Sequence, residues 1–201
     1  MKLKIALVTL GLLLAPSVMA QDVVGRALID GKRVELLSDQ TWRFEDQAAA
    51  PAGCKNVHAR LQFCGSTTQW QTAQPANADI VAAYRHDDRN YAQFIVEGIG
   101  TNDGMTPEFM RNVVIENAAT ATGQSKEDIV VIGIEDAQID GKDGETVIYQ
   151  FRVDGLQVVF ANTIVVTEDL TVQAMTYSVA PGYNDTQRAL TADFIAGTKI
   201  N

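Results

Sequence analysis

Hydrophobic and polar positions alternate most regularly over residues 145–180. This stretch is rich in β-branched and aromatic residues, and turn sequences at Asp154-Gly155 and Thr167-Glu168-Asp169 divide it into three segments. Because Asp-Gly between alternating segments is a strong hairpin signal, the pattern predicts three consecutive antiparallel strands. The predicted strands are Thr146–Val153, Leu156–Val166 and Leu170–Val179.

The first of these strands has one mostly apolar side and one mixed side, because neighbouring side chains point to opposite faces of a sheet. The apolar side carries Val147, Tyr149, Phe151 and Val153, and the other side carries Thr146, Ile148, Gln150 and Arg152. A sheet with an apolar face needs a second layer of structure to bury it. Two amphipathic segments elsewhere in the chain can supply that layer.

The first amphipathic segment is predicted to be a helix that starts at Thr106 and ends at Gly123. Thr106 suits the N-cap position, Pro107 the first helical position, and Glu108 the positive end of the helix dipole. Glycine is a typical residue at the end of a helix. Helical spacing predicts a stripe facing the core, made of Phe109, Met110, Val113, Val114, Asn117, Ala118 and Ala121.

The second amphipathic segment is predicted to be a helix capped by Asn184 and ended by Gly197. Gln187 follows Asn184 by three residues, which is the spacing of a capping box. The side chains expected to face inward are Leu190, Phe194 and Ile195.

Residues 21–45 are predicted to form a small separate β unit, followed by a linker over residues 46–53. Its predicted strands are Val23–Ile29, Val34–Leu37 and Thr41–Phe44, with a turn at Asp30-Gly31. The sequence DGKRVELLSDQTWRF resembles a short β element of exported bacterial proteins that contains an Asp-Gly-Thr-Trp turn. Gln40 stands here in place of the turn glycine. We expect Trp42 to be buried against its own hairpin.

Residues 54–201 are predicted to form an α+β domain, an antiparallel β-sheet covered by helices, because the antiparallel strands are consecutive and the helices lie apart from them. Before the meander, the pattern predicts strands at Asp79–His86, Tyr91–Ile99 and Ile129–Ile134 and a short strand or turn at Asn56–Phe63. Residues 136–145 are predicted to be an acidic turn.

Several segments, taken together, resemble the PsbP/Mog1-like superfamily over about residues 65–200. They are Trp70, AAYRHDDRNYAQFIVEGIG, TPEFMRNVVIENA, the meander and ALTADFIAGTKI. The layout is similar to that of the exported bacterial proteins of unknown function in this superfamily. The resemblance implies an antiparallel sheet between helices and a role in protein binding, and it implies no catalytic residue.

Residues 1–20 have the pattern of a cleavable signal peptide. A positively charged start, an apolar run over residues 5–14 and the small-x-small sequence Val18-Met19-Ala20 predict cleavage after Ala20. The apolar run is shorter than the roughly 20 residues that a membrane-spanning helix needs, which disfavours an uncleaved anchor. We therefore expect a periplasmic or secreted protein with no integral membrane segment in the mature chain.

The two cysteines, Cys54 and Cys64, are expected to form a disulfide, because they are close in sequence and the compartment is oxidising. A redox site would favour a Cys-x-x-Cys motif, which is absent. A zinc site would need more ligands than these two thiols and His58.

The net charge of the full chain is −9, and loss of residues 1–20 removes two lysines, leaving 14 basic and 25 acidic residues and a net charge of −11. Such a surface repels nucleic acid and anionic lipid, so no nucleic-acid partner is expected. The charge is typical of a solubilising surface, and the alternative is an acidic docking face for a basic partner.

Two acidic clusters are candidate ion or catalytic sites. The segment 136–145 contains Asp136, Asp140, Asp143 and Glu145, but their irregular spacing and the central Lys142 disfavour calcium binding. His86 with Asp87, Asp88 and Asp103 is a candidate metal or acid–base site. A lone histidine beside turn aspartates is more often part of a solvated turn. No nucleophile elbow or phosphate-binding glycine loop is present, so no catalytic, metal or cofactor residue is expected.

The sequence favours an exported, non-enzymatic binding or scaffold protein that recognises another envelope protein. The alternative is a periplasmic small-molecule or ion-binding protein with a pocket between sheet and helix, and an acid-residue hydrolase is a third hypothesis. An exposed patch with some of Tyr84, Tyr91, Tyr177 and Tyr183 would indicate protein binding. An enclosed pocket with converging polar groups would indicate a ligand. The oligomeric state stays open.

Overall fold

The structure is a computed structural model that describes residues 23–29, 32–44 and 53–201. The chain divides into two compact units, residues 1–46 and 47–201. The predicted signal peptide, the Asp30-Gly31 turn and most of the predicted linker lie outside the described residues.

The N-terminal unit is a three-stranded antiparallel sheet, as the sequence predicts. Its strands are β1 (Val23–Ile29), β2 (Lys32–Leu37) and β3 (Trp42–Phe44), in that order across the sheet.

The turn between β2 and β3 keeps the geometry of a glycine turn, because Gln40 takes a φ of 68°, in the left-handed region. The prediction that Trp42 is buried against its own hairpin is wrong, since its side chain is 52% exposed. Its cross-strand neighbour Leu36 is 39% exposed, so the hairpin alone does not cover this side of the sheet.

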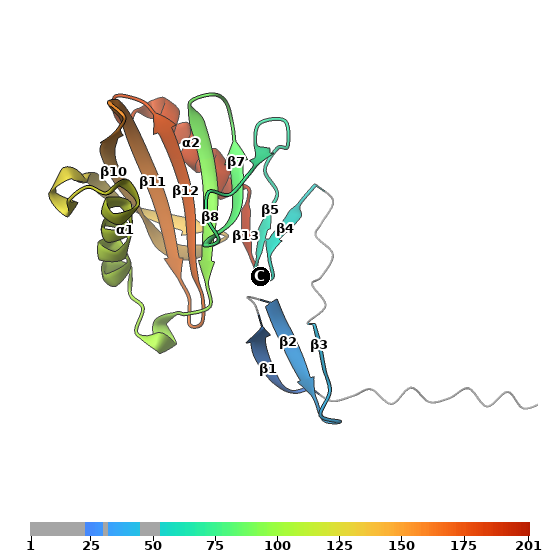
Figure 1. Cartoon of the computed structure of the whole chain (residues 1–201). Helices are drawn as coiled ribbons and strands as arrows, with labels where there is room; N and C mark the ends of the chain where they lie inside the picture. The colour runs from blue at the N-terminus through green and yellow to red at the C-terminus, as the bar shows by residue number, and fades with distance from the viewer. Residues whose placement is uncertain (1–22, 30–31, 45–52) are drawn as a thin grey trace, which may run out of the picture. The chain divides into compact units, whose positions relative to one another are not determined.

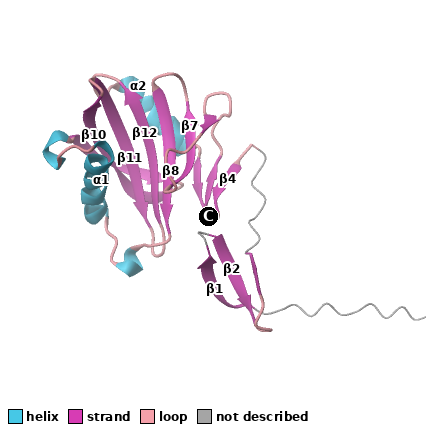
Figure 2. Ribbon diagram, in the orientation of Figure 1, coloured by secondary structure: helices cyan, strands magenta, loops and turns pink. Residues whose placement is uncertain are grey.

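The second unit is an α+β domain built on a seven-stranded antiparallel sheet of order β6-β7-β8-β12-β11-β10-β9 (Figures 1 and 2). The strands are β6 (Gln71–Ala73), β7 (Ile80–Arg85), β8 (Asn90–Glu97), β9 (Val130–Ile139), β10 (Lys142–Val153), β11 (Leu156–Val166) and β12 (Thr171–Val179). The predicted meander is confirmed as β10, β11 and β12. Asp154 and Gly155 form the first of its turns with φ angles of 50° and 81°.

Two helices cover opposite faces of this sheet. The first, α1 (Pro107–Thr122), lies between β8 and β9 in the chain, and α2 (Asp185–Ala196) follows β12. Both predicted caps are confirmed, since the Thr106 hydroxyl accepts a hydrogen bond from the Phe109 backbone N–H and Asn184 forms a capping box with Gln187. Two short 3-10 helices, η1 (Thr101–Asp103) and η2 (Lys126–Asp128), flank α1. No helix in the described ranges is long and apolar enough to cross a membrane.

The face of the seven-stranded sheet that α2 covers, called the α2 face below, is closed by an aromatic core. A second small antiparallel sheet also covers it, made of β4 (Lys55–His58), β5 (Leu61–Phe63) and β13 (Thr198–Ile200). The rings that meet here belong to Phe63, Trp70, Tyr84, Phe94 and Phe194. The predicted disulfide between Cys54 and Cys64 joins the ends of β4 and β5. The sequence pattern did not predict β13 or β6, because strands of three residues carry too little alternation.

The α1 face is covered over β10 and β11 only. Met110, Val114 and Ala118 are buried against a cluster on these strands that includes Val147, Tyr149, Phe151 and Ile164. The predicted core stripe of α1 is too wide, since Phe109 is 51% exposed and Asn117 and Ala121 are also exposed. A helix lying over two strands buries a narrower stripe than one packed into a closed core. Arg111 anchors the helix, because its guanidinium donates two hydrogen bonds of 2.6 Å to the buried carboxylate of Glu145.

The prediction of an acidic turn over residues 136–145 is wrong. These residues are the ends of β9 and β10, and only Asp140 and Gly141 form the turn, with φ angles of 52° and 73°. A second Asp-Gly pair, Asp143-Gly144, lies inside β10, and its glycine is needed for a reason other than a turn. A Cβ atom on Gly144 would lie 2.1 Å from the backbone oxygen of Ile164, so β10 and β11 approach too closely there for any side chain.

We expect Gly144→Ala to lower the free energy of unfolding by about 1–3 kcal/mol, because the new methyl group collides with a backbone atom that cannot move away. Urea denaturation of the two purified proteins measures the difference. Gly133→Ala in β9 is the matched control, since a Cβ there meets nothing within 4 Å. Equal midpoints for the Gly144 and Gly133 variants would contradict the close approach of the strands.

Candidate ligand-binding site

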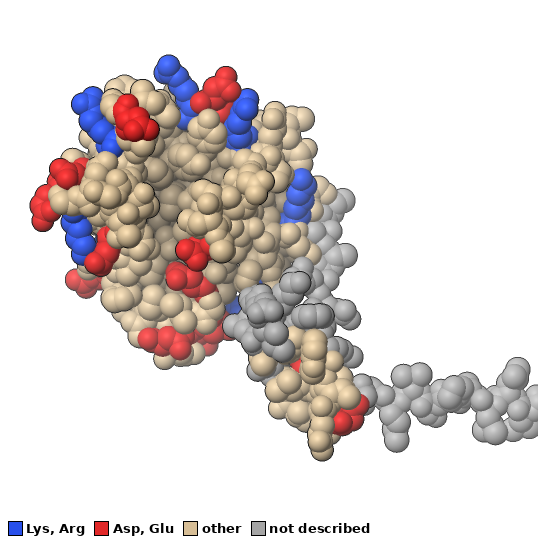
Figure 3. All heavy atoms as spheres, in the orientation of Figure 1, with Lys and Arg blue, Asp and Glu red and all other residues tan. Residues whose placement is uncertain are grey.

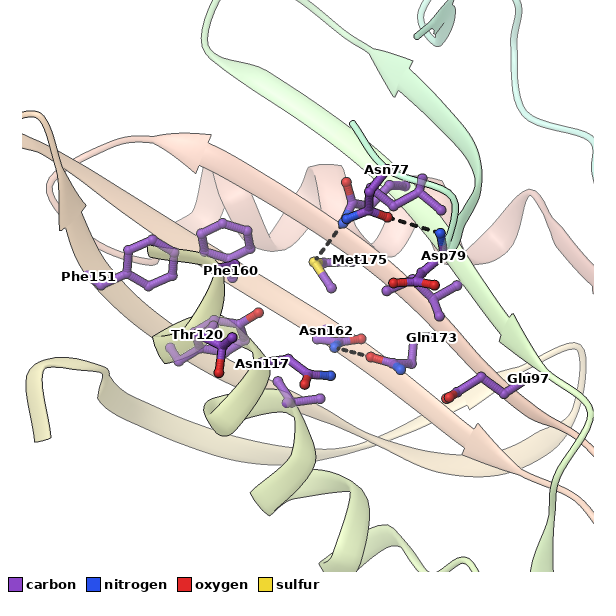
Figure 4. A pocket seen from close by; sticks show the side chains of 17 residues that line it. Asn77, Asp79, Glu97, Asn117, Thr120, Phe151, Phe160, Asn162, Gln173 and Met175 are labelled. Atoms are coloured by element: carbon purple, nitrogen blue, oxygen red, sulfur yellow. Dashed lines mark hydrogen bonds between the residues drawn. The ribbon is translucent and has the colours of Figure 1, made fainter. Parts of the chain in front are cut away.

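A cleft of about 370 Å³ lies beside α1, where the helix stops covering the sheet (Figure 4). Its walls come from α1 and the strands β8, β10, β11 and β12, together with the loop before β7. The volume falls in the range of small-molecule sites, roughly 300–1,000 Å³. The cleft therefore matches the pocket between sheet and helix that the sequence raised as an alternative.

One end of the cleft is aromatic. Tyr149, Phe151 and Phe160 line it, and the Tyr149 and Phe160 rings stack with centroids 5.1 Å apart. The row of rings continues across the sheet, because Phe160 stacks on Tyr177 at 5.2 Å and Tyr177 on Tyr91 at 5.3 Å.

The strand register produces this row. Tyr149 is directly opposite Phe160, Phe160 is opposite Tyr177, and Tyr177 is opposite Tyr91. Such cross-strand pairs bring side chains of one face into contact. Burial raises the pKa of Tyr149, and burial followed by the neighbouring Tyr91 raises that of Tyr177. The hydroxyl groups of Tyr149 and Tyr177 therefore stay protonated at neutral pH.

The floor of the cleft carries a buried pair of amides. Asn162 in β11 is 0% exposed, and its amide nitrogen donates a hydrogen bond of 2.8 Å to the side-chain oxygen of Gln173 in β12, which is 4% exposed. The side-chain carbonyl oxygen of Asn162 (Oδ1) is buried and accepts no hydrogen bond from any described residue. An unsatisfied buried acceptor costs about 1–3 kcal/mol, so its presence requires an explanation.

The opposite end of the cleft is acidic. Asp79, just before β7, and Glu97, at the end of β8, line it, and Asn77 lies beside them (Figure 4). The structure shows no salt bridge to Asp79 or Glu97 among the described residues, and no lysine or arginine lines the cleft. The helix side contributes the exposed Asn117 and Thr120.

The acidic residues of segment 136–145 do not converge. Asp140 accepts hydrogen bonds from the Lys199 ammonium at 3.0 Å and the Ile200 backbone N–H at 3.2 Å, and the hydrogen bond from Lys199 lowers its pKa. Asp143 accepts one from Gln138, and Glu145 pairs with Arg111. Among the residues that the structure describes, no three His, Cys, Asp or Glu side chains are grouped to hold a metal ion.

The His86 cluster is a hairpin turn. Asp87 accepts hydrogen bonds from the backbone N–H groups of Arg89 and Asn90 and lies 3.1 Å from the His86 ring nitrogen. Burial opposes ionisation of Asp87, but the hydrogen bonds from the Arg89 backbone N–H and the Asn90 side-chain amide, together with the interaction with His86, outweigh it and lower its pKa to about 2. Asp103 belongs to a different turn, where it accepts from the backbone N–H of Gly100.

Of the tyrosines considered from the sequence, Tyr84 is buried in the α2-side core, and burial raises its pKa to about 12. Tyr91 and Tyr177 are half-buried in the stacked row. Asn162 and Gln173 are not among the candidate residues predicted from the sequence. A signal for them exists, because each is an amide inside a mostly apolar strand, VVFANTIVV and TVQAM.

No protein-family model and no curated protein sequence matches the chain. Among solved structures, cyanobacterial PsbP from Synechocystis sp. PCC 6803 is similar over 93% of this chain and 98% of that protein, with 12% identity and a TM-score of 0.47. A protein from Bacteroides thetaiotaomicron is similar over 71% of this chain, at 12% identity and a TM-score of 0.47. This chain spans 46% of that protein's length.

LpqN of Mycobacterium tuberculosis, described as involved in cell envelope biogenesis, is similar over 70% of this chain and 83% of its own length, with 13% identity and a TM-score of 0.39. A PsbP protein, of the superfamily that the sequence resembles, is thus among the solved structures similar to this chain. At these identities and TM-scores the similarities carry no information on function.

We expect the single change Gln173→Leu to destabilise the fold by about 1–3 kcal/mol, because it leaves the amide nitrogen of Asn162 buried without a partner as well. The double change Asn162→Leu, Gln173→Leu should unfold at no lower urea concentration than the wild type, because it removes both buried polar groups. A double variant less stable than the single one would show that the amide pair is structural and that its free acceptor has no cost.

Proposed function

We propose that the protein is an exported, non-enzymatic binding protein that takes a small organic molecule into the cleft beside α1. The observation that carries the proposal is the carbonyl oxygen of Asn162, a fully buried acceptor without a partner at the floor of the cleft. A hydrogen-bond donor on a ligand would satisfy it. The apolar rings on one side of the same cleft would bury the rest of the ligand.

Two further features support the proposal. The disulfide between Cys54 and Cys64 is typical of proteins that work outside the cytoplasm. The titratable groups that line the cleft are Asp79, Glu97 and Tyr149, and no hydrogen bond joins any two of them among the described residues. A binding role suits this set better than acid–base catalysis, which needs such groups within hydrogen-bond reach of each other or of one reacting atom.

The test uses N-phenyl-1-naphthylamine, a neutral amine that joins a naphthyl to a phenyl group and whose fluorescence rises in apolar sites. We expect saturable binding to the wild type, and about tenfold weaker binding to Ala121→Trp, a loss of ~1.4 kcal/mol. The tryptophan would occupy the cleft from an exposed position on α1. Ala192→Trp, at an exposed position of α2 outside the cleft, is the matched control and should bind like the wild type.

The melting temperature of each variant is measured alongside, so that misfolding is distinguished from a filled cleft. Absence of saturable fluorescence with the wild type, or equal affinity of Ala121→Trp and the wild type, would overturn the assignment of a ligand to this cleft.

Recognition of another envelope protein is the second candidate function, and the edge strand β9 favours it. Val130, Val131, Ile132 and Ile134 are 45–51% exposed on a strand that ends the sheet. The first half of β9, residues 130–134, carries no charged residue, and such an edge with exposed apolar side chains can pair with an extended segment of a partner. Acidic residues on both sides of it, including Asp128 and Asp136, favour a partner segment with basic flanks.

We expect an envelope protein to be captured by the immobilised wild type and by the control Ala192→Lys, but not by Ile132→Lys, Ile134→Lys. The added charges would lie beside the cross-strand side chains of the partner and repel its basic flanks. The captured protein is then purified and its affinity measured directly by calorimetry. Equal binding of the purified protein to the wild type and the β9 variant would exclude this strand as the docking surface.

A further inference from the structure

The cleft beside α1 is polarised along its length. Phe151 and Phe160 lie at one end, Asp79 and Glu97 lie at the other, and the amides of Asn162 and Gln173 lie between them (Figure 4). A ligand that fills the cleft therefore meets aromatic rings at one end, a buried acceptor in the middle and carboxylates at the other end.

The charge at the acidic end is not compensated inside the cleft. Asp79 and Glu97 form no salt bridge with a described residue, and the lining contains no cationic side chain. On the face shown in Figure 3, Lys and Arg side chains lie toward the margin, whereas acidic side chains lie both at the margin and near the middle. The potential in the cleft is therefore negative, and a bound anion would be repelled.

The two other parts of the cleft point to the same ligand chemistry. The carbonyl oxygen of Asn162 accepts but cannot donate, so it selects for an N–H or O–H group. The faces of aromatic rings attract cations as well as stack on flat apolar groups. A bare metal ion would use none of the rings that line the cleft.

Resting on the proposed function, we infer that the cleft selects an organic cation: a molecule with a flat apolar body against Phe151 and Phe160 and a protonated nitrogen that reaches toward Asp79 and Glu97. An aromatic or alicyclic amine has this chemistry. The nitrogen or a neighbouring donor group would satisfy the acceptor of Asn162. Selection depends on the charge at one end of the ligand and not on its apolar area.

The experiment compares three probes of nearly equal size that share one ring system and differ in charge. They are 1-naphthylmethylamine, which is cationic at neutral pH, 1-naphthalenemethanol, which is neutral, and 1-naphthaleneacetate, which is anionic. Each is titrated into the full mature chain by calorimetry, and by displacement of N-phenyl-1-naphthylamine. We expect the amine to bind about tenfold more tightly than the alcohol, and the acetate to bind more weakly than both.

The preference is then measured in Asp79→Asn, Glu97→Gln, where the affinity ratio of amine to alcohol should fall to about one because the attracting charges are gone. The control Glu127→Gln, Asp136→Asn removes the same charge from exposed positions outside the cleft, and should keep the ratio of the wild type. The ratio reports on charge selection even if one variant binds all probes less well.

Equal affinities of the wild type for all three probes would overturn the inference and leave the proposed function standing. So would a preference for the amine that persists in Asp79→Asn, Glu97→Gln, since the charge would then act from elsewhere on the surface. Failure of N-phenyl-1-naphthylamine to bind the wild type would overturn the proposed function itself.

Discussion

The pleat of the meander is the constraint on which the rest of the structure depends. Successive side chains of β10, β11 and β12 point to opposite faces, and the strands pair in a continuous antiparallel register. This register sends one set of residues toward α2 and the other toward α1. It also lines up Tyr149, Phe160 and Tyr177 as direct cross-strand neighbours. A slip of one residue would exchange the two sets and put the amides of the cleft into the aromatic core.

The two faces of the sheet are covered to different extents, so that one forms a closed core and the other holds the cleft. On the α2 face, rings from the small second sheet, from β7 and β8 and from α2 itself close around Phe194, which is 0% exposed. On the α1 face, one helix covers two strands and is anchored at one end by Arg111 and Glu145. The half-covered face leaves room for a cleft.

The amide pair at the floor of the cleft lowers the free energy of unfolding, because it keeps polar groups in a buried position. Leucine would suit the position of Asn162 better, because the residue is 0% exposed and an apolar side chain leaves no polar group to satisfy there. Sequences that keep a polar group in such a place break a local rule of stability, and these departures are expected at functional sites. Aromatic rings and uncompensated carboxylates in the same cleft fit that interpretation.

The sequence by itself determined the α+β class, the three strands of the meander, both helices with their caps and the disulfide pair. All of these depend on neighbours within a few residues, such as Thr106 with Phe109 or Asp154 with Gly155. The tertiary structure alone decided which face each helix covers, that Phe109 and Trp42 are exposed, and that Gly144 marks a close approach of strands and not a turn. It alone brought Asp79, Glu97, Asn162 and Gln173 to one cleft. These residues come from four separate segments, and their distances depend on strand order and register, which no local pattern encodes.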